Sequence, residues 1–231
     1  MERGLSLVPG AGRRAAGNRP EPKALAKPFR LPAPPRPTLG ELFAANPRDG
    51  GWAGFLLPQL ETARPVLWVQ ERMAILEAGR IHPPGLHQPF LIHVEARDAR
   101  DVLWAMEEGL RCSGLGAVIG EIWGDPAVLD FTATRRLAVA AERSAVPCWL
   151  IRLNGMANLS GARMRWRIAS SPSLPHSFDP KAPGAPAWDA ELFRARGFAP
   201  GGWSVTHDAN RFHLLAQASD RALAQGGRRA A

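Results

Sequence analysis

Residues 90–123, FLIHVEARDARDVLWAMEEGLRCSGLGAVIGEIW, decide the fold of this chain. Residues 90–94 and 117–123 are apolar runs with the length and composition of buried strands, and a helical pattern lies between them. Asp98 is placed to cap that helix. Its apolar residues recur at helical spacing: Val102, Leu103, Met106 and Leu110. A strand, a helix and a second strand joined by short links predict a right-handed βαβ unit in a parallel sheet.

The sequence also marks the outer side and the end of this helix. Glu107 and Arg111 stand four residues apart and are predicted to form an ion pair on the solvent side. Gly114 and Gly116 follow the last apolar position and are predicted to end the helix.

The same alternation extends through the middle of the chain. Residues 66–69 and 148–153 are further apolar runs of strand length. Between the later strands, Asp130 or Thr132 can begin a helix with a face of small apolar residues, which Pro147 follows. We therefore expect an α/β fold with a mostly parallel sheet flanked by helices, in which ligands bind at the carboxyl ends of the strands.

Beyond residue 154 the pattern predicts antiparallel structure. Arg163, Arg165 and Arg167 alternate with apolar residues, which indicates a half-exposed strand with one arginine face. Residues 188–196 and 203–207 flank a turn that contains Gly and Pro, and they predict a hairpin.

The chain divides into three parts. Residues 1–37 are rich in Pro and Arg and have too few regularly spaced apolar residues to pack, so they are predicted to be a disordered basic arm. Residues 38–208 form one α/β domain with the C-terminal hairpin, and residues 209–231 form a tail or a short helix. Most of the formal charge of +8 lies at the two ends. Such ends favour nucleic acid or acidic partners, and a merely solubilising role is the alternative.

No run in the sequence reaches the roughly 18 to 20 apolar residues of a membrane span. Cys112 and Cys148 are far apart and are predicted to be small core residues in a reducing compartment. We therefore expect a cytoplasmic protein that does not contact membranes.

Residues 44–57 are the one segment placed where a phosphate-binding loop would lie. Gly50 and Gly51 supply flexible backbone, but Trp52 stands near the position of the lysine that such a loop needs. Arg48 is the remaining cation, and its planar guanidinium does not replace a compact ammonium. We expect no ATP or magnesium cofactor and no catalytic activity.

Two acids lie near the ends of predicted strands, Glu71 and Glu121. A water-activating acid and a metal-binding acid can be placed in this way. The alternative, which we favour without the lysine, is that each carboxylate caps a loop or pairs with an arginine. The six histidines show no ligand spacing, so no metal site is expected.

The predicted face of Arg163, Arg165 and Arg167 is a candidate binding surface. It could meet a nucleic-acid backbone or an acidic partner, and a solvated sheet face is the alternative.

The order of these segments from residue 41 to about 171 resembles the RecA core. Within that superfamily the chain resembles the ImuA family, and the resemblance covers roughly residues 38–205. It is carried by FLIHVEARDA (90–99), LWAMEEGLR (103–111), AVIGEI (117–122), LDFTATRRLAVAAE (129–142) and RMRWRI (163–168).

This resemblance implies a non-catalytic, RecA-like accessory of SOS-induced translesion DNA synthesis and mutagenesis. The implied partners are an ImuB-like relative of Y-family polymerases, an error-prone replicative-type DNA polymerase and RecA. Contact with DNA through the basic ends, a location at the nucleoid and self-association are further expectations. By position, Glu71 would match the RecA family's catalytic glutamate and Glu121 its Walker B acid. Residues 154–162, which follow the last parallel strand, would match a DNA-binding loop, yet they contain no basic or aromatic residue.

Two other functions stay open at this point. One is a DNA-dependent ATPase in which another group replaces the missing lysine. The other is a cell-division inhibitor, because ImuA-like chains are sometimes grouped with SulA.

Overall fold

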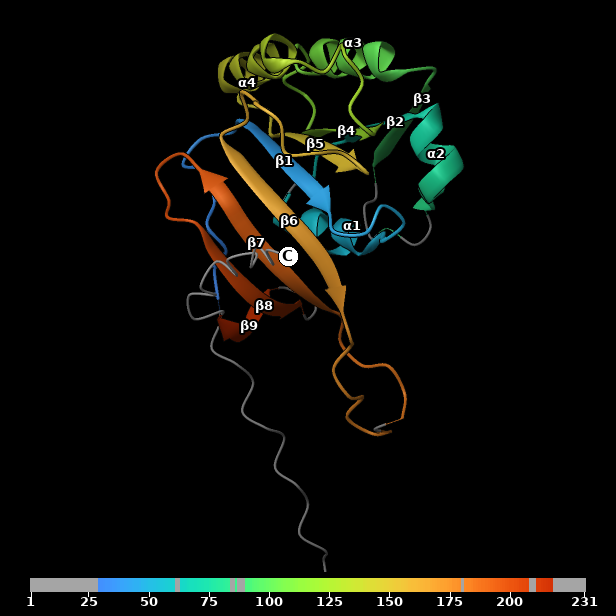
Figure 1. Ribbon diagram of the computed structural model, residues 1–231, viewed down its shortest axis with the longest axis vertical. Helices are drawn as coiled ribbons and strands as arrows, with labels where there is room; N and C mark the ends of the chain where they lie inside the picture. The colour runs from blue at the N-terminus through green and yellow to red at the C-terminus, as the bar shows by residue number, and fades with distance from the viewer. Residues whose placement is uncertain are drawn as a thin grey trace, which may run out of the picture.

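The computed structural model describes residues 29–60, 63–83, 86, 90–179, 181–207 and 211–217. Residues 1–28 of the predicted arm and residues 218–231 of the predicted tail lie outside the described residues. Within the described part, nine strands form one sheet in the order β3-β2-β4-β5-β1-β6-β7-β8-β9 (Figure 1). The strands are β1 (Leu39–Ala44), β2 (Val66–Glu71), β3 (Leu91–Ala96), β4 (Ala117–Trp123), β5 (Cys148–Leu153), β6 (Met164–Ser171), β7 (Ala187–Ala195), β8 (Gly201–His207) and β9 (Phe212–Gln217).

The sheet changes direction at β6. From β3 to β6 all neighbouring strands are parallel, and from β6 to β9 they are antiparallel. The predicted α/β class, with a mostly parallel sheet and a C-terminal hairpin, is confirmed. The helices are α1 (Gly51–Leu56), η1 (Leu57–Gln59, a 3₁₀ turn), α2 (Arg72–Ala78), α3 (Ala99–Gly109) and α4 (Phe131–Ser144). None of these described helices has the length and apolar character that a membrane span requires.

Both long helices begin at the predicted caps. The Asp98 side chain accepts hydrogen bonds from two backbone N–H groups in the first turn of α3, and the Asp130 side chain accepts one at the start of α4. Such caps satisfy N–H groups that have no partner within a helix. Helix α4 ends where Ala145 adopts a left-handed conformation, with φ of 57°.

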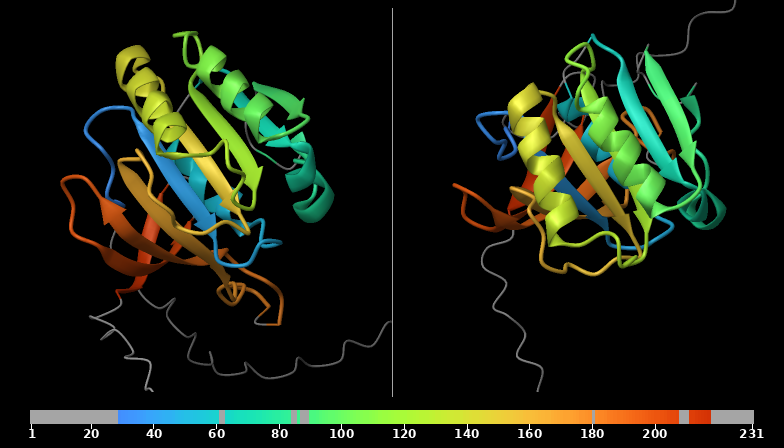
Figure 2. Two further views of the ribbon diagram at one scale, coloured as in Figure 1. Left: turned by 45° about the horizontal axis from the view of Figure 1, so that its top comes forward. Right: turned by 90° about the horizontal axis from the view of Figure 1, so that it is seen from above.

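The two faces of the sheet carry different cores. Helices α3 and α4 lie side by side over one face (Figure 2), where they bury aliphatic residues such as Met106 and Leu137. Gly120 on β4 permits this close approach, because a Cβ there would lie 2.2 Å from the Met106 sulfur. The other face packs against α1 and η1 and is rich in aromatic side chains, Trp52, Phe55, Trp68, Trp166 and Trp188 among them. Burial of this aromatic area is a large stabilising contribution.

The predicted boundary of the disordered arm at residue 37 is wrong for residues 29–37. The Phe29 N–H donates to the Phe212 carbonyl at 3.2 Å, and the Phe29 ring lies 5.9 Å from the Trp203 ring. Leu31 also packs against the aromatic core. Phe29 and Leu31 are too few to form a periodic sequence pattern, but their packing against the aromatic core holds this segment in place.

The C-terminal strands confirm the hairpin and correct the predicted tail. Strands β7 and β8 pair as expected across the Gly- and Pro-containing turn. The sequence predicts a tail or a short helix from residue 209, but Phe212–Gln217 form strand β9 and pair with β8. The pairing satisfies backbone groups that β8 would otherwise leave open at the sheet edge.

Two smaller expectations are also wrong. Glu107 pairs with Arg136 of α4 at 2.9 Å, and Arg111 pairs with Glu108, so the expected Glu107–Arg111 pair does not form. The side of α3 on which Glu107 lies faces α4, which a helix considered alone cannot reveal. Cys112 is exposed after the end of α3, whereas Cys148 is buried in β5 as predicted.

Candidate functional site

The loop between β1 and α1 holds the carboxylate of its own Asp49 at the start of α1. The Gly51 N–H, at the start of α1, donates to Asp49 Oδ1 at 2.8 Å. The same carboxylate accepts hydrogen bonds from the backbone N–H and the hydroxyl of Ser170 on β6, at 2.7 and 2.6 Å. Burial alone would raise the pKa of Asp49, but these hydrogen bonds hold the pKa below its ordinary value. A negative charge therefore already lies at this helix start.

The predicted loop residues Gly50, Gly51 and Trp52 pack against neighbouring strands or precede the helix. Gly51 lies so close to β6 that a Cβ would be 1.9 Å from the Ser170 hydroxyl oxygen. Trp52 is buried, and its ring packs on Trp68 with centroids 5.6 Å apart. Gly50 precedes α1 as its capping residue, without a side chain to cap it.

Arg48 does not point into this loop. Its side chain is about three-quarters exposed, and its guanidinium pairs with Glu77 of α2 at 3.3 Å. The cation that the sequence offered in place of a lysine is thus engaged at the surface.

Glu121 is buried on the aromatic side of the sheet and has neutral hydrogen-bond donors. Trp68 Nε1 donates to one carboxyl oxygen, and Gln70 Nε2 donates to the other at 2.9 Å. Gln70 is itself fixed, because its amide oxygen accepts from the Ile81 N–H at 3.0 Å. Burial raises the pKa of Glu121 to about 7, against the smaller opposing effect of the two donors.

Glu71 lies at the end of β2 and points to the opposite face of the sheet. Gln70 is the register partner of Glu121, and successive side chains in a strand alternate between faces. The Glu71 carboxylate accepts a hydrogen bond from the Trp123 N–H at 2.7 Å, and burial raises its pKa. The structure therefore does not bring the two acids together on one face.

The three predicted arginines are all engaged in ion pairs; Arg163 directly precedes β6, and Arg165 and Arg167 lie within it. Arg163 pairs with Glu142 of α4, and Arg167 pairs with Glu191 of β7. Arg165 is only 3% exposed and pairs with the fully buried Glu41 of β1 at 2.7 Å. The expectation of a half-exposed arginine face is wrong for Arg165, because β1 supplies a carboxylate directly beside it in the sheet.

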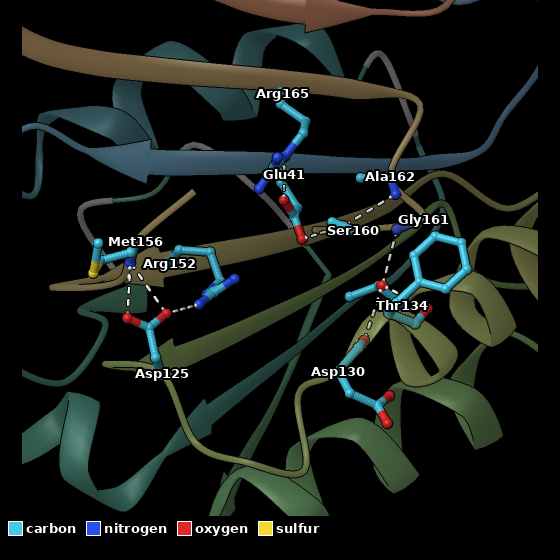
Figure 3. Close-up of polar contacts among 11 residues, drawn as sticks. Glu41, Asp125, Asp130, Thr134, Arg152, Met156, Ser160, Gly161, Ala162 and Arg165 are labelled. Atoms are coloured by element: carbon cyan, nitrogen blue, oxygen red, sulfur yellow. Dashed lines mark hydrogen bonds and ion pairs between the residues drawn. The ribbon is translucent and has the colours of Figure 1, made fainter. Parts of the chain in front are cut away.

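Figure 3 shows how this pair anchors the loop between β5 and β6. Ser160 in the loop donates to the second oxygen of Glu41 at 2.7 Å, and the Gly161 N–H donates to the Thr134 hydroxyl of α4 at 2.9 Å. At the other end of the loop, Asp125 accepts a hydrogen bond from the Met156 N–H and pairs with the buried Arg152.

One aromatic ring lies between the two buried arginines. The Arg152 and Arg165 guanidiniums lie 5.4 and 5.2 Å from the centre of the Phe43 ring. Such contacts are favourable when the cation is removed from water. The sequence had not singled out Glu41 or Asp125, because a lone acid in a strand or a loop carries no spacing pattern that predicts its partner.

The chain was compared with known proteins. No family model matches it. It is 34% identical over 183 residues to the protein named Protein ImuA in two strains of Caulobacter vibrioides, which covers 71% of this chain and 72% of that protein. The chain belongs to the ImuA family. The resemblance predicted from the sequence is confirmed, and the features above describe this ImuA-family member. In the described part of the chain, no three His, Cys, Asp or Glu side chains come together as a metal site would require.

Proposed function

We propose that this ImuA-family protein is a non-catalytic, RecA-like accessory of damage-induced mutagenesis, and that it acts by binding other proteins. The observation that carries the proposal is the Asp49 carboxylate at the start of α1, hydrogen-bonded to Gly51 and Ser170. A nucleotide phosphate in this position would meet a negative charge instead of free N–H groups.

The acids support the same proposal. In RecA-like ATPases one acid holds magnesium and another orients water, so both must reach the nucleotide. Here Glu121 is buried and both its oxygens accept hydrogen bonds from Trp68 and Gln70. Glu71 is directed to the other face and bonded to the backbone of β4. A hard cation binds poorly to a carboxyl group that is partly protonated and already engaged.

The proposed partners follow from the family. They are an ImuB-like relative of Y-family polymerases, an error-prone replicative-type polymerase and RecA, at the nucleoid. Large apolar side chains that lie in the open offer contact surface, among them Leu76 of α2 and Trp104 of α3, which are 69% and 65% exposed. Exposed aromatic residues of this kind are frequent anchors of protein interfaces.

Two measurements test the proposal. Tagged protein is recovered from DNA-damaged cells after nuclease treatment, and the retained proteins are identified by mass spectrometry. Recovery of an ImuB-like protein or a polymerase supports an accessory role, and a Trp104→Ala variant with unchanged melting temperature tests whether α3 contributes. The purified protein is also melted with and without saturating ATP and magnesium. A rise of several degrees that disappears in Glu121→Ala would show the nucleotide binding that the ATPase alternative requires, and would contradict the proposal.

A further inference from the structure

The loop between β6 and β7 projects from the domain and carries one highly exposed aromatic side chain. We name residues 172–179 and 181–186 the tongue. It leaves the body of the domain beyond the carboxyl end of β6 (Figure 1). Phe178 near its tip is 91% exposed, more than any other large hydrophobic residue in the described part of the chain.

The tongue is held in shape by its own hydrogen bonds. Leu174 exchanges backbone hydrogen bonds with residues 184 and 185, and Pro175 and Pro183 form a β-bridge. At the tip, the Phe178 N–H donates to His176 Nδ1, and the Asp179 carboxylate accepts from the Lys181 N–H. A preorganised loop loses little conformational entropy on binding, which favours its use as a contact element.

The opposite end of the domain has a mostly apolar groove. It lies at the amino ends of β1, β5 and β6 and has a volume of about 220 Å³. Proline and other apolar side chains dominate its lining, which also includes Trp149 and Arg36. Its further lining includes Pro32, Ala33, Pro34 and Met164.

We propose that the tongue of one copy of this chain inserts Phe178 into the groove of a second copy. The groove matches the ring in size and in apolar character. Asp179 follows Phe178 directly, with Lys181 two residues further on, and the exposed Arg36 in the groove lining supplies the charge opposite to that of Asp179. This contact is independent of the proposed function.

The contact must join two molecules. Met164 lines the groove and Ser171 leads into the tongue, so the length of β6, roughly 23 Å, separates the two within one chain. A contact between different surfaces of identical copies is head-to-tail, and its repetition produces an open chain of molecules. A single aromatic anchor buries little area, so the association is weak and depends on concentration.

Mixed single-cysteine variants test the geometry. In a Cys112→Ser background, which removes the exposed thiol, one batch carries Ser177→Cys, next to the intact Phe178 ring, and a second, tagged batch carries Ala33→Cys. Oxidation of the mixture is expected to produce a covalent dimer of one tagged and one untagged chain, at least tenfold above either batch alone. A matched control pairs Ser177→Cys with Leu76→Cys, on exposed α2. Equal yields from the control and the groove pair would overturn the proposal.

Sedimentation velocity of the full-length protein provides the second measurement. From about 10 to 500 μM, the average sedimentation coefficient is expected to rise, and Phe178→Ala is expected to abolish the rise. Leu76→Ala removes a similarly exposed apolar side chain and should leave it unchanged. A monomer over the whole range, or an association that Phe178→Ala does not alter, would contradict the proposal.

Discussion

The buried carboxyl group of Glu121 should make the protein less stable as the pH rises towards neutrality. Its pKa is raised to about 7 in the folded protein, from an ordinary value of 4.5. Between these two values the folded state retains a proton that the unfolded state has released. A raised carboxyl pKa therefore lowers the free energy of unfolding as the pH increases through this window, the reverse of the behaviour of an ion-paired acid.

The magnitude follows from the two pKa values. A difference of one unit corresponds to about 1.4 kcal/mol, so the unfolding free energy should fall by about 2 to 3 kcal/mol between pH 5 and pH 8 through this group. Other groups titrate in the same range, and Glu121→Gln isolates the effect because the amide does not titrate.

Urea unfolding of both proteins at several pH values is the assay. Glu121→Gln carries a cost of its own, because its amide nitrogen faces the Nε2 donor of Gln70. That cost is the same at every pH, so only the change in the difference between the two proteins is informative. A difference that stays constant from pH 5 to pH 8 would refute the reasoning, since it would mean that Glu121 is ionised throughout.

Three further predictions concern the fixed loop, the buried ion pair and the segment before β1. Asp49→Ala removes the acceptor for Gly51 and Ser170, and should lower the free energy of unfolding by about 1 to 2 kcal/mol, measured as a melting temperature lower by roughly 3 to 8 °C. This loss should shrink below about pH 4. The pKa of Asp49 is lowered in the folded protein, so its carboxylate stabilises the fold only at pH values above its pKa in the unfolded chain. Glu41→Gln leaves the buried Arg165 without its counter-charge and should lower the free energy of unfolding in urea by about 3 to 5 kcal/mol. Glu191→Gln at the exposed Arg167 pair should lower it by less than about 1 kcal/mol. Equal losses of stability in the two variants would contradict this assignment. Deletion of residues 1–37 should cost about 2 to 3 kcal/mol more than deletion of residues 1–28, because only the longer deletion removes Phe29 and Leu31 from the aromatic core.

The sequence could predict the parts of the fold that depend on neighbouring residues. The strands at 117–123 and 148–153 and the caps Asp98 and Asp130 lie where the pattern placed them, because strand composition and capping are local properties. The placement of β9 was not predictable in this way, since it depends on an open edge that β8 provides.

The candidate site was predicted less well, because its contacts join distant parts of the chain. Alternation along β6 predicted the apolar side of the strand, but the burial of Arg165 depends on Glu41, 124 positions away. Asp49 was passed over for the same reason, since Ser170 lies 121 positions further on. Glycine spacing alone marked the loop and could not show which anion occupies it.

The contacts of Asp49 bear on how a protein of this kind could be regulated. A nucleotide-dependent RecA-like domain changes state when a phosphate arrives at the loop after its first strand, because the phosphate supplies contacts that the empty loop lacks. Here a side chain of the loop itself makes those contacts, and Ser170 ties them to β6. No phosphate is needed to hold this arrangement, and a nucleotide would have to displace Asp49 from Gly51 and Ser170 before a phosphate could bind there. Under the proposed binding function, control would come from the abundance of the protein and from the partners that its exposed surfaces meet.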